Sequence, residues 1–142
     1  MTPQTLELFT SATTDAYAWI DEICGELDWF DRHRALRALR AALHVLRDHL
    51  SVEQNAKLSA QLPTLVRGIY YEGWHPGPPS RERGIEGYLD ALSAADPTER
   101  EVDPFEIARG VYAVLARHVS PGEVEKIVAT LPHRLRILWE AP

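Results

Sequence analysis

Apolar residues recur along the chain at steps of three and four positions, which is the spacing of one face of an α-helix. The clearest stripe lies between Asp31 and Ser51 and consists of leucines: Leu36, Leu39, Leu43, Leu46 and Leu50. An earlier stripe, in residues 15–27, combines larger apolar side chains: Trp19, Ile20, Ile23 and Leu27. No segment shows the sustained alternation of apolar and polar residues that is typical of a strand. The pattern therefore predicts an all-α protein.

Residues with capping chemistry mark where several helices begin. Asp31 is placed to cap the leucine-rich helix. Residues 51–54 read Ser-Val-Glu-Gln and residues 120–123 read Ser-Pro-Gly-Glu, and both are capping boxes. Asp103 precedes a proline at the first helical position, where the missing N–H has no cost. The Leu-Pro pairs at 62–63 and 131–132 predict helix breaks, because a residue before proline avoids the helical conformation.

The second half of the chain repeats the first at a constant shift of 69 positions. The aligned pairs include Val45 with Val114, Leu46 with Leu115, His49 with His118, Ser51 with Ser120, Lys57 with Lys126, Pro63 with Pro132 and Arg67 with Arg136. The copies span about 17–71 and 86–140, and a linker rich in glycine and proline, 73–84, joins them. Such a repeat predicts two tandem copies of a roughly four-helix unit in one helical domain, 1–142, packed as a compact pseudo-symmetric bundle.

The remaining helices follow from these boundaries. In the first copy, short helices are expected over 52–61 and 64–72. In the second copy, helices are expected over 85–94, 103–118, 121–130 and 132–140.

Net charge and cysteine content narrow the class of protein. The formal net charge is −6 at pH 7, whereas a domain that coats nucleic acid is usually basic. The single cysteine, Cys24, leaves no internal disulfide and fits a reducing compartment. The N-terminal residues lack a basic stretch followed by an apolar core, and no apolar run is long enough to span a bilayer. These features predict a cytoplasmic protein with no signal peptide and no membrane partner.

Two stretches of the sequence carry a family resemblance. Residues 60–74 read Ala-Gln-Leu-Pro-Thr-Leu-Val-Arg-Gly-Ile-Tyr-Tyr-Glu-Gly-Trp, and residues 113–120 read Ala-Val-Leu-Ala-Arg-His-Val-Ser, with Leu131-Pro132 following. From about residue 16 to residue 139, the chain resembles the bacterial domain-of-unknown-function family 2267. The resemblance implies an all-helical bacterial domain, often a stand-alone protein and often found among stress-related genes. It implies no catalytic residues, because the family has none established.

Aromatic residues gather directly before the linker. Tyr70 aligns with Trp139 in the repeat and is therefore expected in the core. Tyr71 and Trp74 are expected at the surface, beside the proline-rich segment. Exposed aromatic side chains are typical anchors for a protein partner. Tyr71 and Trp74 are accordingly candidate residues for binding another protein or a second copy of this chain.

A basic face on the leucine-rich helix supports a different function. Its residues step by three, four and three positions, away from the leucines: Arg37, Arg40, His44 and Arg47. Such a face can meet the phosphates of nucleic acid. It can also pair with the acidic helix before it, within one subunit or across a dimer. The face is not repeated, since the second copy has Glu106, Arg109, Ala113 and Ala116 at these positions. Arg37, Arg40 and Arg47 are therefore candidate binding residues whose exposure the sequence leaves open.

No residue pattern identifies a catalytic, metal or cofactor site. Glu72 and His75 have the Glu-x-x-His spacing of carboxylate di-iron sites, but the predicted helix ends between them. His49 and His118 are repeat equivalents at helix ends, where a capping role accounts for both. Cys24 lies beside an apolar stripe, which favours a buried and unreactive thiol. The sequence predicts no catalytic residue, no metal and no cofactor.

Three functions remain open at this point. The preferred interpretation is a non-enzymatic helical module that binds or scaffolds proteins, with a stress association implied by the resemblance. The alternative is a nucleic-acid-binding protein that uses the basic face. The third is a small-ligand or metal sensor that uses the space between the two copies.

Overall fold

Residues 6–140, the part that the computed structural model describes, contain helices and no strand. Seven α-helices and a final 3₁₀ helix follow one another: α1 (Glu7–Leu27), α2 (Arg32–Asp48), α3 (Val52–Ser59), α4 (Thr64–Tyr71), α5 (Ile85–Ala95), α6 (Pro104–His118), α7 (Pro121–Thr130) and η1 (His133–Trp139). The all-α prediction is therefore confirmed. The opening residues 1–5, on which the expectation of no signal peptide partly rests, lie outside the described part.

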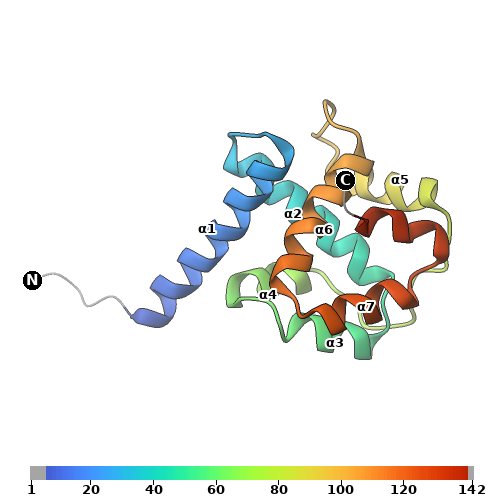
Figure 1. Ribbon diagram of the computed structural model, residues 1–142, viewed down its shortest axis with the longest axis horizontal. Coiled ribbons are helices and arrows are strands. Elements are labelled where there is room, and N and C mark those ends of the chain that lie inside the picture. The colour runs from blue at the N-terminus through green and yellow to red at the C-terminus, as the bar shows by residue number, and fades with distance from the viewer. Residues whose placement is uncertain (1–5, 141–142) are drawn as a thin grey trace, which may run out of the picture.

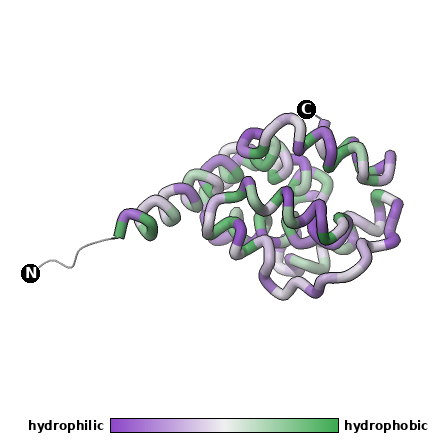
Figure 2. Tube along the Cα trace, turned by 90° about the horizontal axis from the view of Figure 1, so that it is seen from below, coloured by the Kyte–Doolittle hydropathy of each residue, from purple (hydrophilic) through white to green (hydrophobic). Residues whose placement is uncertain are grey.

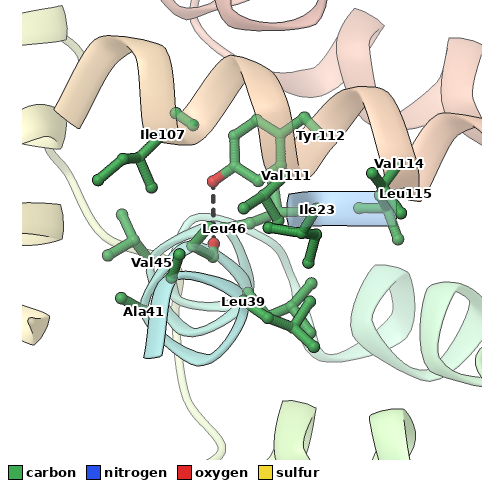
Figure 3. Packing of buried hydrophobic residues seen from close by; sticks show 14 of the residues in the cluster. Ile23, Leu39, Ala41, Val45, Leu46, Ile107, Val111, Tyr112, Val114 and Leu115 are labelled. Atoms are coloured by element: carbon green, nitrogen blue, oxygen red, sulfur yellow. Dashed lines mark hydrogen bonds between the residues drawn. The ribbon is translucent and has the colours of Figure 1, made fainter. Parts of the chain in front are cut away.

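Two long helices, α2 and α6, form the centre of the fold (Figure 1). Beside the predicted leucine stripe, smaller side chains of α2 are also buried: Ala35, Ala38, Ala41, Ala42 and Val45. In the close-up of this contact, Tyr112 of α6 donates a hydrogen bond of 2.9 Å to the carbonyl oxygen of Ala42 (Figure 3). The helix α2 is thus buried on several sides, and the prediction of a single apolar stripe is too narrow.

The other helices surround this central pair. Both α1 and α5 pack against α2 and against α6. The short helix α4 packs against α2, whereas η1 packs against α6, and α3 meets α7. The first helix of each predicted copy therefore contacts the second helix of both copies. One hydrophobic core cluster consequently includes residues from both halves of the chain.

Most predicted caps are present, with one difference between the copies. The Asp31 side chain caps α2, and Ser51 opens α3 with a complete capping box. At the start of α7, the Glu123 amide donates to Ser120 Oγ at 3.3 Å. The Ser120 amide, however, donates to Gln61 Oε1 at 2.7 Å. The reciprocal bond of the second capping box therefore comes from a side chain in the other half of the chain.

Two helices differ from their predicted extent or type. α1 begins at Glu7 rather than near residue 15, and its first turns stand clear of the other helices (Figures 1 and 2). Phe9, Ala12 and Ala16 continue the stripe of α1 at steps of three and four, but alanines add little to an apolar pattern. Residues 133–139 form a 3₁₀ helix instead of an α-helix, and this run of seven residues is longer than most 3₁₀ helices.

The segment between α4 and α5 contains no helix. It passes the end of α2, where the Ser80 amide donates a hydrogen bond of 2.6 Å to the Asp48 carbonyl oxygen. Among the described residues, no helix is both long and apolar enough to cross a lipid bilayer.

Candidate functional site

The arginines of α2 form ion pairs within the chain. The pairs and their N–O distances are Arg32–Asp21 at 2.9 Å, Arg34–Glu99 at 2.6 Å, Arg37–Asp96 at 3.7 Å and Arg40–Glu72 at 3.0 Å. The expectation that the acidic first helix supplies the carboxylates is correct only for Arg32. The other carboxylates come from the end of α4 and from the loop between α5 and α6. Pairing with nearby acids therefore neutralises most of the predicted basic face.

Arg47 is the most deeply placed of these arginines, with a side chain only 7% exposed. Its Nη1 donates to the carbonyl oxygens of Tyr70 and Glu72, at 2.9 Å and 2.8 Å. Its Nε lies 3.0 Å from Asp48 Oδ1. A guanidinium suits this position, because the carbonyls at the end of a helix carry the negative end of the helix dipole. Arg47 therefore ties α2 to the C-terminal end of α4.

His44 makes a similar contact one turn earlier on α2. Its Nε2 lies 2.7 Å from the carbonyl oxygen of Ile69. Burial lowers the pKa of His44, although the hydrogen bond to Ile69 opposes this shift. The ring is therefore neutral near pH 7, and Nε2–H donates. Together, His44 and Arg47 supply donors to three carbonyls at the end of α4: those of Ile69, Tyr70 and Glu72.

Tyr71 and Trp74 are half-buried rather than fully exposed. The hydroxyl groups of Tyr71 and Ser59 lie 2.6 Å apart, and the rings of Tyr71 and Trp74 are 5.1 Å apart. Trp74 and Arg47 line one open cleft of about 350 Å³ between the end of α2 and the linker that follows α4. The structure therefore brings four of the five predicted site residues to the end of α4, while Arg37 lies apart at Asp96.

A groove larger than this cleft lies in the second copy. It has a volume of about 510 Å³ and runs between α6 and η1, with the end of α1 at one side. Its floor includes Gly110, Ala113, Ala116, Leu138 and Trp139. Ala113 and Ala116 are the repeat equivalents of His44 and Arg47. In the alignment of the two copies, this groove therefore has two alanines where the first copy has two long side chains.

Charged residues form the rim of this α6–η1 groove. Arg117 pairs with Glu26 and, at 3.2 Å, with Glu22 of α1. Arg109 donates a hydrogen bond of 3.1 Å to the carbonyl oxygen of Glu140. Within residues 6–140, the side chains of Glu106 and Glu140 form no ion pair. The rim therefore offers two carboxylates, whereas both of its arginines already have acceptors.

The sequence-based search missed this groove. Ala113 and Ala116 have no reactive groups, so no motif points to them. The signal that was present is the repeat itself, because these alanines align with a histidine and an arginine. A site of this kind becomes visible once η1 is placed beside α6.

Burial shifts the pKa of several other reactive groups in the described chain. Burial raises the pKa of the Cys24 thiol, which is partly exposed. Burial likewise raises the pKa of Tyr88 and Tyr112, whose hydroxyl groups hydrogen-bond to each other in the core. Between residues 6 and 140, no group of three or more His, Cys, Asp or Glu side chains is placed to hold a metal ion.

Comparison with known proteins finds a match that covers most of the chain. The family model described as an uncharacterized conserved protein (DUF2267) matches residues 16–138. This range covers the cleft at Arg47 and most of the α6–η1 groove, and leaves out the first turns of α1. A search among curated proteins found no match. With nearly the whole chain matched, the protein belongs to the DUF2267 family.

Proposed function

We propose that this protein is a non-enzymatic protein-binding module whose α6–η1 groove receives a segment of a partner protein. The observation that carries the proposal is the open groove of about 510 Å³, with an apolar floor, at a place that His44 and Arg47 bridge in the first copy. Grooves of this form, apolar within and charged at the rim, are typical docking sites for an extended or helical segment.

The proposal includes a pseudo-twofold relation between the two copies. The packing supports it: α1 lies on α6 while α5 lies on α2, and α4 lies on α2 while η1 lies on α6. Superposition of residues 17–71 on 86–140 tests this relation directly. The functional consequence is a bundle with two related faces, of which one is bridged by its own side chains and the other is open.

The alternative functions have less support. Nucleic-acid binding by α2 needs unpaired arginines, whereas Arg34, Arg37 and Arg40 have carboxylate partners within the chain. A sensor for a small ligand has the cleft at Arg47 and Trp74 as its best site. A role under stress belongs to the proposal through the family resemblance, and cytoplasmic location belongs to it because the single cysteine fits a reducing compartment.

Selection of peptides against the groove tests the proposed function. Phage-displayed random peptides are selected on the full-length protein and then measured against the double variant Ala113→His with Ala116→Arg. This variant carries the first copy's side chains at the second copy's positions. We expect selected peptides to lose most of their affinity for it, while the control Ala94→Arg, a like change at an exposed site on α5, keeps the affinity. Equal binding to the double variant would exclude the groove as the docking site.

A further inference from the structure

We propose that the α6–η1 groove recognises an arginine side chain of the partner segment. This inference deepens the proposed function and rests on it, because it names the chemical group that the partner inserts. The argument uses the first copy of the repeat as an internal template for the second.

The first copy shows which group fits the equivalent place. There the Arg47 guanidinium reaches from α2 across to α4 and donates to the carbonyl oxygens of Tyr70 and Glu72. A single planar group with several N–H donors satisfies two carbonyls and one carboxylate together. This binding position, between α2 and the end of α4, is deep enough to leave the Arg47 side chain only 7% exposed.

The second copy keeps the apolar walls of this place, lacks the arginine, and has Arg117 where the first copy has Asp48. Ala116 stands at the Arg47 position, and Leu138 and Trp139 stand at those of Ile69 and Tyr70. All three of these second-copy residues line the groove. At the end of η1, the carbonyl oxygen of Glu140 already accepts a hydrogen bond of 3.1 Å from Arg109. The groove therefore offers apolar walls that suit the stem of an arginine from outside, and its free acceptors are the carboxylates of the rim.

The rim of the groove favours the same occupant. The Glu106 and Glu140 carboxylates flank it without an ion pair in residues 6–140, and Arg117 is already held by Glu22 and Glu26. Trp139 also lines the groove, and an indole face attracts a guanidinium. A purely apolar occupant, such as the exposed Leu8 and Phe9 of a second copy, would leave these acceptors without donors. An arginine satisfies both the acceptors and the walls.

The side chain at position 116 provides the first test. Nα-acetyl-arginine amide is titrated into the full-length protein, and the indole N–H signal of Trp139 is followed by NMR after assignment with Trp139→Phe. We expect a saturable shift in the wild type, a response at least about tenfold weaker for the citrulline analogue, and no shift in Ala116→Arg. Ala94→Arg should respond as the wild type does. Equal responses to the arginine and citrulline compounds, or an unchanged response in Ala116→Arg, would overturn the inference.

The selected peptides provide the second test. If the inference is correct, they share an arginine whose replacement by citrulline weakens binding at least about tenfold, whereas replacement of a neighbouring residue does not. Peptides that bind the groove without any arginine would overturn the inference and leave the proposed function standing. Failure to select any groove-dependent peptide would overturn both.

Discussion

The ring of His118 stacks on the indole of Trp19, with centroids 4.6 Å apart and planes inclined by 24°. Sixty-nine positions earlier along the chain, His49 packs against Tyr88, the repeat equivalent of Trp19, with centroids 4.7 Å apart. In each pair the histidine comes from one copy and the larger aromatic ring from the other. The copies therefore complete each other's cores rather than stand side by side as closed units.

This exchange predicts that neither half folds alone. Residues 1–81 and 82–142, produced as separate fragments, each lack a helix that packs on their central helix. We expect neither fragment to show a cooperative thermal transition by circular dichroism, because each exposes core surface that its own residues cannot cover. An equimolar mixture should regain the helical signal and the cooperative melt of the intact chain. A cooperative melt in one isolated fragment would contradict the prediction.

The close approach of α1 and α6 predicts opposite effects for two glycine substitutions. A Cβ atom at Gly110 would lie 2.8 Å from Leu27 Cδ2, which is closer than ordinary packing allows. We expect Gly110→Ala to lower the free energy of unfolding by roughly 1–3 kcal/mol, because the packed Leu27 side chain must move away from the new methyl group. Gly25, in the last turn of α1, has no atom within 4 Å of such a Cβ.

Gly25→Ala is the matched control for this contact. We expect it to raise the free energy of unfolding by roughly 0.4–1 kcal/mol, since alanine restricts the unfolded chain and favours the helix. Chemical denaturation of both variants measures the difference. Equal midpoints for the two alanine variants would show that Leu27 yields without cost.

The contact of α1 with the end of α6 predicts a pH-dependent stability. Burial raises the pKa of Glu22, but hydrogen bonds from His118 and Arg117 outweigh it, so the net shift is downward. A lowered pKa in the folded state means that this contribution to stability is present above the ordinary carboxylate pKa. It is lost as the pH falls through the folded-state value.

Glu22→Gln removes the titrating group and tests the shift. At pH 7 we expect this variant to be less stable than the wild type by roughly 0.2–1 kcal/mol, because the pair is partly exposed. The difference should shrink as denaturation is measured at successively lower pH below about 4. Glu125→Gln, at an exposed site on α7, should show no such convergence. A gap that stays constant down to acid pH would contradict the proposed role of Glu22.

The sequence predicts helices well where local chemistry sets their limits and less well where packing does. Asp31 and Ser51 mark helix starts through hydrogen bonds made within one turn, and both appear as predicted. The early start of α1 depends on Ala12 and Ala16, whose short side chains leave a weak pattern. The bond from Ser120 to Gln61 joins residues 59 apart, so no local motif encodes it.

The residues of the candidate site could likewise be predicted from local sequence, whereas their burial and contacts depend on packing. The sequence identifies Arg47 as a candidate binding residue. Its burial, however, depends on where the end of α4 lies in the fold. In the sequence, Tyr71 and Trp74 lie next to a linker rich in glycine and proline. In the structure, the hydroxyl group of Tyr71 is hydrogen-bonded to that of Ser59. The groove beside α6 is open because Ala113 and Ala116 have short side chains. Short side chains of this kind form no recognisable sequence motif.

The capping serines predict unequal losses of stability. Ser51 takes part in a complete capping box within its own copy, with bonds of 3.0 Å and 3.1 Å. The Ser120 hydroxyl accepts one longer hydrogen bond of 3.3 Å, and the Ser120 amide donates to the Gln61 side chain. We expect Ser51→Ala to lower the free energy of unfolding by roughly 0.5–2 kcal/mol, with Ser120→Ala near the lower end of this range. Urea denaturation at pH 7 measures both, and an unshifted midpoint for Ser51→Ala would show that this cap does not stabilise the protein.

The arginines of α2 predict a graded effect that separates a structural role from nucleic-acid binding. Arg47→Gln leaves the carbonyls of Tyr70 and Glu72 without their donor in a buried place, so we expect a loss of roughly 1–3 kcal/mol in the free energy of unfolding. Arg37→Gln and Arg40→Gln remove partly exposed pairs and should each cost about 0–1 kcal/mol.

The same three variants, combined, decide whether α2 binds nucleic acid. Gel-shift measurements with duplex DNA and with RNA, at low and at physiological salt, should show no retention by the wild type, because nearby carboxylates already neutralise Arg37 and Arg40. The melting temperature of the triple variant should fall, mainly because of the Arg47→Gln substitution. Of the three arginines, Arg47 is the one that donates hydrogen bonds to two carbonyl oxygens. A protein that binds phosphates through this face behaves in the opposite way. It retains nucleic acid in a salt-sensitive manner, loses that retention in the triple variant and keeps its melting temperature. That result would replace the α6–η1 groove with α2 as the functional surface.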